Sequence, residues 1–237
     1  MPVITVSGSL ASGAREIAQA AAREIHLDYV DQEILVAAAT ELGVSVSAME
    51  SHDERTATFG ERLAGLMRII VERSAAAGAA DPASGSLGLD VVLGRTYGEA
   101  AALSAEDGGG QLDDARYIKT LASVIKAIAS RGDVVILGRG SQAILQGASS
   151  TIHVYVAAPR EHRVAGLMHR DGIDRTEAER RIDKSDHNRQ AFHRHYFKID
   201  ADSPTLYDLG INAGRIRTDT AARMIALAAA DLAPRPG

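Results

Sequence analysis

Short apolar runs alternate along the chain with longer segments in which apolar residues recur every three or four positions. The short runs are dominated by Val, Ile and Leu and are bounded by small or polar residues, which predicts buried strands. These predicted strands cover 3–6, 27–30, 134–137, 152–156 and 209–212. The longer segments predict helices, over 14–25, 33–41, 54–74, 112–130, 159–170, 174–196 and 220–232.

The alternation of strands and helices predicts an α/β fold. Strands joined through helices run parallel and carry helices on both faces of their sheet. We therefore expect a three-layer domain with about five parallel strands flanked by helices. The 237 residues suit one domain of this kind. In such a sheet, ligand-binding residues collect at the carboxyl ends of the strands.

The first predicted strand runs into a loop of small residues at 8–15, and a helix follows directly. Gly8 and Gly13 have the G-x-x-x-x-G spacing of loops that bind phosphate through their N–H groups, with a helix N-terminus behind them. Ala14 and Arg15 stand where such loops carry Lys and Ser or Thr. Two glycines are a weak signal by themselves, so an ordinary tight strand-to-helix turn is the alternative interpretation.

Composition narrows the class of protein. The net charge is -5 and the pI is about 5.9, so the chain has no overall basic character for nucleic acid. It has no Cys, and no apolar stretch reaches the roughly 18 residues of a membrane span. No basic region precedes the first apolar run, and we therefore expect a cytoplasmic protein that binds neither nucleic acid nor a membrane. The segment 75–110 is rich in Ala, Gly and Ser, which predicts a mobile insertion.

Charged residues follow two other predicted strands. Asp31 comes after the strand at 27–30, and Arg139 follows the strand at 134–137 between two glycines. An Arg at a strand end, where glycines leave the backbone open to a ligand, favours a guanidinium fork for an anion. The alternative is a structural ion pair between Arg139 and a carboxylate such as Asp31.

The polar helix predicted at 174–196 carries a basic stripe. Arg181, Ser185 and Arg189 are four residues apart and share one helix face. Over a phosphate loop, such a stripe would neutralise charge on phosphoryl oxygens. The alternative is a solvated face with local ion pairs. The spacing of the nearby histidines is not that of metal ligands, so we expect no metal site at His187, His193 and His195.

Several motifs together resemble the cytidylate kinase-like family, a branch of the nucleoside monophosphate kinases. In chain order they are SGAREI at 12–17, YVDQEI at 29–34, HDE at 52–54, VILGRG at 135–140, Arg163 with Arg170, DHNR at 186–189 and YDLGIN at 207–212. The resemblance implies a single kinase-like domain, 1–237, with a P-loop NTPase-type core at about 1–42, 112–160 and 205–232. It also implies a helical nucleoside monophosphate-binding region with the insertion at about 43–111, and a lid at about 171–198.

By the same resemblance, the reaction would be transfer of the ATP γ-phosphoryl group to a nucleoside monophosphate, with Mg²⁺. The loop would hold the donor phosphates through Gly8, Ser9, Leu10, Ala11, Ser12, Gly13 and Ala14. Asp31 and Arg139 would face the acceptor, and Arg163 and Arg170 would lie near the nucleotide. The lid would supply Lys184, Asp186 and Arg189. The catalytic cations would be Arg15, Arg139 and Arg189.

Two departures from the family pattern bear on activity. Ala14 and Arg15 replace the loop Lys and Ser, which removes a cation and a Mg²⁺ ligand; Arg15 would substitute for the Lys with a different geometry. Gly140 stands where cytidylate kinases have Asp. The first hypothesis is therefore a kinase acting on a cytidine-type nucleotide or a similar acceptor. The second is a catalytically weak module that binds or senses nucleotide. The apolar helices are compatible with a homodimer.

Overall fold

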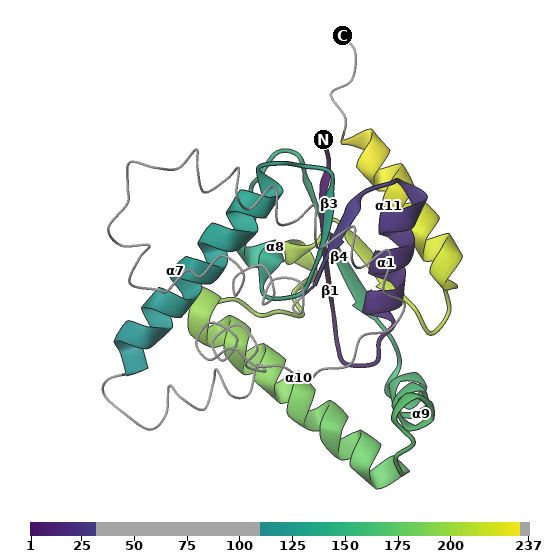
Figure 1. Ribbon diagram of the computed structural model, residues 1–237. Helices are drawn as coiled ribbons and strands as arrows, with labels where there is room; N and C mark the ends of the chain where they lie inside the picture. The colour runs from purple at the N-terminus through teal and green to yellow at the C-terminus, as the bar shows by residue number, and fades with distance from the viewer. Residues whose placement is uncertain (32–109, 233–237) are drawn as a thin grey trace, which may run out of the picture.

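The computed structural model describes residues 1–31 and 110–232, which form a five-stranded sheet with helices on both faces (Figure 1). All the strand pairings are parallel, and the order β2-β3-β1-β4-β5 puts the first strand at the centre. The strands are β1 (Val3–Gly8), β2 (Asp28–Val30), β3 (Val134–Leu137), β4 (Thr151–Ala157) and β5 (Leu209–Asn212). The predicted parallel α/β fold is confirmed.

The helices of this part of the chain are α1 (Ala14–Glu24), α7 (Gly110–Ala129), α8 (Ser141–Ile144), α9 (Arg160–Asp171), α10 (Arg175–Phe197) and α11 (Thr218–Asp231), with a 3-10 turn η1 (Pro204–Leu206). Asp174 caps α10, since its side chain accepts a hydrogen bond from the N–H of Glu177 (2.8 Å). Pro159 is the N-cap of α9 and not a residue of its first turn. The sequence does not predict α8 and η1 because elements this short show no hydrophobic period.

Some predictions fall outside the described residues. These are the helices at 33–41 and 54–74, the insertion at 75–110 and nearly all of the expected acceptor-binding region at 43–111. Within residues 1–31 and 110–232, no helix is both long enough and apolar enough to cross a bilayer.

The two faces of the sheet bury separate apolar clusters, and the period of two along each strand decides which residue faces which helices. Ile4 and Val6 of β1 pack in the cluster that includes α1 and α11. Val3 of β1 and Ile136 of β3 pack in the cluster that includes α7. Figure 1 shows the same arrangement, with α7 and α8 on one side of the sheet and α1 and α11 on the other. Because both faces are covered, β3 is apolar without interruption.

The helices α9 and α10 extend beyond the carboxyl ends of the strands, below the sheet in Figure 1. The segment expected to form a lid, 171–198, contains α10 and only the last residue of α9. We call α9 and α10 together the lid helices. They share a small apolar cluster made by Val164, Leu167, Ala178 and Ile182. Leu10 and Ala11, in the loop after β1, pack against this cluster. The two helices are therefore in contact with the predicted phosphate loop.

Candidate functional site

The loop after β1 is tightly wound. Ala11 (φ 57°) and Gly13 (φ 84°) both have left-handed backbone conformations, which costs an Ala roughly 1–2 kcal/mol. Gly8 leaves no room for a side chain, because a Cβ there would lie 2.6 Å from the Cβ of Ala14 and 2.8 Å from the carbonyl oxygen of Val156. The first turn of α1 therefore packs directly on the start of the loop, and the loop keeps its shape at some cost in backbone strain.

This loop offers an anion its N–H groups and the positive end of the α1 dipole. Ser12 adds a buried hydroxyl whose Oγ has no hydrogen-bond partner among the described residues. Buried polar groups are almost always hydrogen-bonded in native proteins. A phosphate oxygen bound in the loop would satisfy the Ser12 hydroxyl, so the local chemistry suits a phosphate-bearing ligand.

Arg15 and Asp31 lie together at the edge of this loop. In the first turn of α1, Nη1 of Arg15 is 3.0 Å from Oδ2 of Asp31, which follows β2. The side chain of Arg15 is 48% exposed and that of Asp31 only 6%. Tyr29 donates a second hydrogen bond to the same Asp31 oxygen (3.2 Å). Asp31 is thus paired with Arg15, although the sequence alone left it open as a partner of Arg139.

Arg139 lies in the turn that follows β3 and is only 3% exposed. Its φ is 58°, and Gly138 and Gly140 on either side also have positive φ. The N–H of Gly138 donates to the carbonyl oxygen of Val6 in β1 (2.9 Å), which places this turn beside the start of the loop. A buried residue held in a strained conformation at a strand end is typical of a functional site. Arg139 therefore occupies the edge of the sheet at which ligand binding was expected.

Arg163 joins the lid to the loop. It lies on α9 and is 7% exposed. Its Nε donates to the carbonyl oxygen of Leu10 (2.8 Å), and Nη1 and Nη2 each donate to one carboxylate oxygen of Asp186 on α10 (2.8 Å each). This is the bidentate geometry in which a guanidinium binds a carboxylate most strongly. The structure thus brings together three of the predicted site residues, although it engages Arg163 within the protein.

Arg189 is buried in α10, with 6% of its surface exposed. Its Nη2 forms an ion pair with Asp202, and its guanidinium lies 5.7 Å from the centre of the Tyr155 ring. Tyr155 in turn donates to Asp202 (2.9 Å) and is the register partner of Ser7 at the end of β1. Only one aromatic ring therefore separates Arg189 from the strand that leads into the loop. Within the described residues, its Nε and Nη1 have no hydrogen-bond partner.

The charges around Arg189 are fixed by its neighbours. Burial acts to raise the pKa of Asp202, but the hydrogen bond and charge of Arg189, together with hydrogen bonds from Gln190 and Tyr155, outweigh it and hold the pKa below its usual value. Burial raises the pKa of Tyr207 to about 12 and raises that of Tyr155 as well. The two phenol rings stack with their centres 4.9 Å apart. At neutral pH the cluster therefore consists of one cation, one anion and two neutral phenols.

A buried chain of hydrogen bonds connects β1 with α10. Ser7 donates to Oε1 of Gln142 (3.0 Å), Nε2 of Gln142 is 2.9 Å from Nε2 of His193, and Nδ1 of His193 is 2.7 Å from the carbonyl oxygen of Arg189. A carbonyl oxygen only accepts, so Nδ1 carries the proton and Nε2 accepts from Gln142. Burial lowers the pKa of His193, which favours this neutral ring. The sequence gives no signal for this role of Gln142 and His193, since Ser7, Gln142 and His193 are remote from one another along the chain.

The remaining predicted residues lie on the surface of the lid. Arg170 pairs with Asp171 (2.7 Å), and Lys184 is exposed. Arg181 is exposed and pairs with Glu177 (2.7 Å). The predicted basic stripe is thus divided, because Arg181 belongs to a solvated face while Arg189 is buried. In the part of the chain that the structure describes, no group of three acidic, His or Cys side chains is placed to hold a metal ion.

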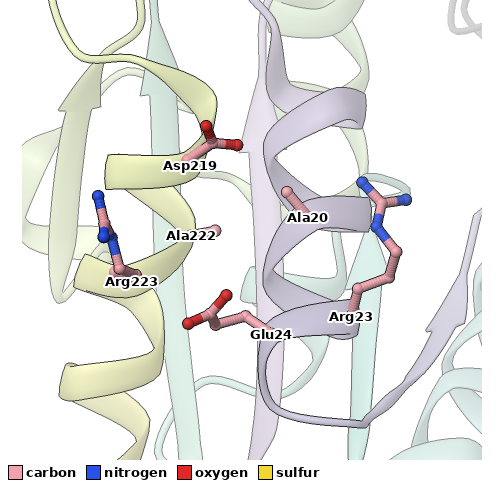
Figure 2. Close-up of a pocket in the computed structure, with 6 residues that line it drawn as sticks. All are labelled: Ala20, Arg23, Glu24, Asp219, Ala222 and Arg223. Atoms are coloured by element: carbon pink, nitrogen blue, oxygen red, sulfur yellow. The ribbon is translucent and has the colours of Figure 1, made fainter.

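A surface depression between α1 and α11 is separate from this site (Figure 2). Charged side chains dominate its lining, which is formed by Ala20, Arg23, Glu24, Asp219, Ala222 and Arg223. These residues of α1 belong to its last turns, whereas the loop precedes its first turn. The depression offers no contact with the loop, and we assign the candidate site to the loop and the lid.

Matches to solved structures cover nearly the whole chain. A protein described as uncharacterized, from Eubacterium ventriosum ATCC 27560, has a TM-score of 0.58 and 17% identity, and the match covers 97% of this chain and 99% of that one. Shikimate kinase from Acinetobacter baumannii, solved in complex with shikimate, has a TM-score of 0.44 and 10% identity, with 99% and 96% covered. At such low identities, the first of these likenesses supports the fold alone.

Sequence comparison adds the family. A cytidylate kinase from Methanopyrus kandleri is 28% identical over 99 residues, which make up 38% of this chain and 51% of that relative. The match therefore spans about half the length of the relative. The family model described as the cytidylate kinase-like family matches residues 3–215, a range that contains the five strands, the loop and both lid helices. The chain therefore belongs to the cytidylate kinase-like family.

Proposed function

We propose that the protein is a phosphotransferase that moves the γ-phosphoryl group of ATP to a nucleoside monophosphate, of the cytidine type or a similar small acceptor. One observation carries the proposal: two buried cations of α9 and α10 lie beside the loop after β1. Arg163 donates to the carbonyl oxygen of Leu10 in the loop. Arg189 lies against the ring of Tyr155, which is the register partner of Ser7 at the end of β1. Membership in the cytidylate kinase-like family supports the same reaction class.

In this reaction, the bond from the γ-phosphorus to the β–γ bridging oxygen breaks, and a bond to an acceptor phosphate oxygen forms. Negative charge grows on the leaving ADP, and cations held in place beforehand stabilise it. The loop N–H groups and the Ser12 hydroxyl would hold the donor phosphates. Arg189 would use Nε and Nη1 on the transferred group, and Arg139 would face the acceptor at the neighbouring strand end.

Among residues 1–31 and 110–232, the loop and its neighbours form no dedicated protein site for the expected Mg²⁺. Arg15 stands where related loops supply a hydroxyl ligand, and a guanidinium has no acceptor atom. The nearby carboxylate, Asp31, is engaged by Arg15. Since Mg²⁺ at kinase sites is held largely by substrate phosphates and water, we propose that it arrives with ATP, and we assign it no step.

Replacement of Arg15 tests the proposal, because Arg15 is the loop cation nearest to the position of the missing Lys. Arg15→Ala is expected to weaken ATP binding and to lower turnover by on the order of a hundredfold, the usual effect of removing a transition-state donor. Turnover is measured as ADP release with a panel of nucleoside monophosphates, and binding by calorimetry. Arg23→Ala, which removes an exposed cation from the last turn of α1, is the control. Unchanged ATP binding in Arg15→Ala would assign the cation role to another residue.

Nucleotide binding without turnover is a second candidate function. It is favoured by Ala14 at the position of the loop Lys and by the salt bridge that holds Arg15 on Asp31. A protein of this kind would bind ATP in the calorimeter and release no ADP with any acceptor of the panel. Absence of ATP binding by the wild-type protein would overturn both candidates.

A further inference from the structure

Arg163 was predicted to lie near the nucleotide, but its guanidinium group is bound entirely by other residues of the protein. Its three guanidinium nitrogens all donate to protein oxygens, one to Leu10 and two to Asp186. The side chain of Arg163 is 9% exposed, whereas that of Asp186 is 31% exposed. The buried member of this pair is therefore the cation, and its contacts run from the lid carboxylate to the backbone of the loop.

The contact with Leu10 fixes the direction of one peptide group. The described residues contain no cis peptide bond, so the carbonyl of Leu10 and the N–H of Ala11 point in opposite directions. Arg163 holds the carbonyl toward α9 and thereby directs the N–H away from α9. Ala11 has a left-handed φ of 57°, which an Ala residue keeps only where its surroundings hold it. On the other side of the turn, the N–H of Ser12 donates to the carbonyl oxygen of Ser9 (3.1 Å).

We propose that Arg163 is a positioning residue that couples the lid to the phosphate loop. While Asp186 holds its guanidinium, its Nε holds the Leu10 carbonyl, and the N–H of Ala11 stays directed at the donor phosphates. This inference rests on the proposed function, since it takes the loop as the ATP site. Leu10 and Ala11 also pack on the apolar cluster shared by α9 and α10, so a movement of the lid helices moves the same peptide. Donor binding and lid position are therefore linked.

Two variants break this link, and a third is a matched control. Arg163→Lys keeps the charge but cannot bridge Leu10 and Asp186, because an ammonium group has no fork of donors. Asp186→Asn removes the anchoring charge and leaves Arg163 in place. The control is Arg160→Lys, since Arg160 forms an exposed bidentate pair with Asp183 (2.5 and 3.0 Å) between the same two helices.

The measurements are calorimetric affinities for ATP and CMP, thermal unfolding, and the amide resonance of Ala11. We expect Arg163→Lys and Asp186→Asn each to weaken ATP binding about tenfold or more, the equivalent of one charge-assisted hydrogen bond. CMP affinity should change less than about threefold, and Arg160→Lys should leave both affinities unchanged. The Ala11 resonance should shift when ATP is added to the wild type and should shift less in Arg163→Lys.

A purely structural role for Arg163 would lower the melting temperature and weaken ATP and CMP alike, and that result would overturn the inference. The inference would also be overturned if the wild type binds ATP and both variants bind it with the same affinity. The proposed function would stand in that case. If Arg163→Lys fails to fold, Asp186→Asn decides, because the side chain of Asp186 is partly exposed and Asn, which has nearly the same size, leaves no buried cavity. A wild-type protein that binds no ATP would overturn the proposed function and, with it, the inference.

Discussion

Arg189 combines deep burial with two nitrogens that lack hydrogen-bond partners among the described residues. A buried guanidinium normally has its donors satisfied, because an unsatisfied buried donor costs about 1–3 kcal/mol. Asp202 balances the charge of Arg189 from one side, and the Tyr155 ring lies against it. The cation is thus held in a fixed place while Nε and Nη1 stay available. Phosphoryl oxygens of a bound nucleotide are the acceptors that would complete its coordination.

Arg189→Ala is therefore expected to lower turnover far more than stability. Loss of the cation should slow phosphoryl transfer on the order of a hundredfold, while Asp202, which is 38% exposed, gains water in place of the lost partner. Steady-state turnover and thermal unfolding measure the two effects. Arg181→Ala, an exposed Arg on the same helix, should change neither. Arg189 is structural if Arg189→Ala unfolds the protein and the better-tolerated Arg189→Lys retains full turnover.

At the turn after β3, this chain has Gly140 where the pattern of cytidylate kinases has Asp, and the local packing accounts for the difference. A Cβ on Gly140 would lie 2.5 Å from a ring carbon of Phe197, and its φ of 69° is unfavourable for a side chain. The Asp that the family pattern carries here has no room in this packing. An Asp at this position would have to displace the ring of Phe197.

At the scale of elements, the chain of hydrogen bonds from Ser7 through Gln142 to His193 ties β1 and α8 to α10. Each member is buried, and each hydrogen bond satisfies a group that would be costly to leave alone. This chain of hydrogen bonds ends on the carbonyl of Arg189, the residue that carries the proposed catalytic cation. Arg189 is thereby joined to β1, the strand that leads into the loop. The position of α10 on the sheet is therefore fixed by polar contacts as well as by apolar packing.

Because His193 is part of this chain of hydrogen bonds, the free energy of unfolding of the protein depends on pH. Burial holds the pKa of His193 below the value of 6.5 that the ring has in an unfolded chain, so the unfolded state binds more protons as the pH falls through that value. The free energy of unfolding should therefore be constant above about pH 7.5 and decrease toward pH 5. Burial lowers the pKa of His153 too, and both rings contribute to the decrease.

The variant His193→Gln tests this role. Its free energy of unfolding, measured by chemical denaturation at each pH, should depend less steeply on pH than that of the wild type. Equal slopes for variant and wild type would contradict this role of His193.

At the scale of the whole molecule, the sequence was sufficient for the sheet and insufficient for the contacts of the site. Strand β3 is apolar throughout because helices cover both of its faces, and such a run is recognisable without any structure. The contact between Arg163 and Leu10 joins residues 153 positions apart, and that between Ser7 and Gln142 spans 135 positions. No local pattern encodes such pairs. The sequence predicts Arg15 and Asp31 each as a site residue, but only the structure pairs them.

Transfer of a labelled phosphoryl group tests the central claim most directly. The wild-type protein is incubated with γ-labelled ATP, Mg²⁺ and each nucleoside monophosphate in turn, and the labelled products are separated. We predict that the label appears in a nucleoside diphosphate in step with ADP formation, with CMP among the accepted substrates. Label that stays in ATP with every acceptor, or that appears only in inorganic phosphate, would contradict it.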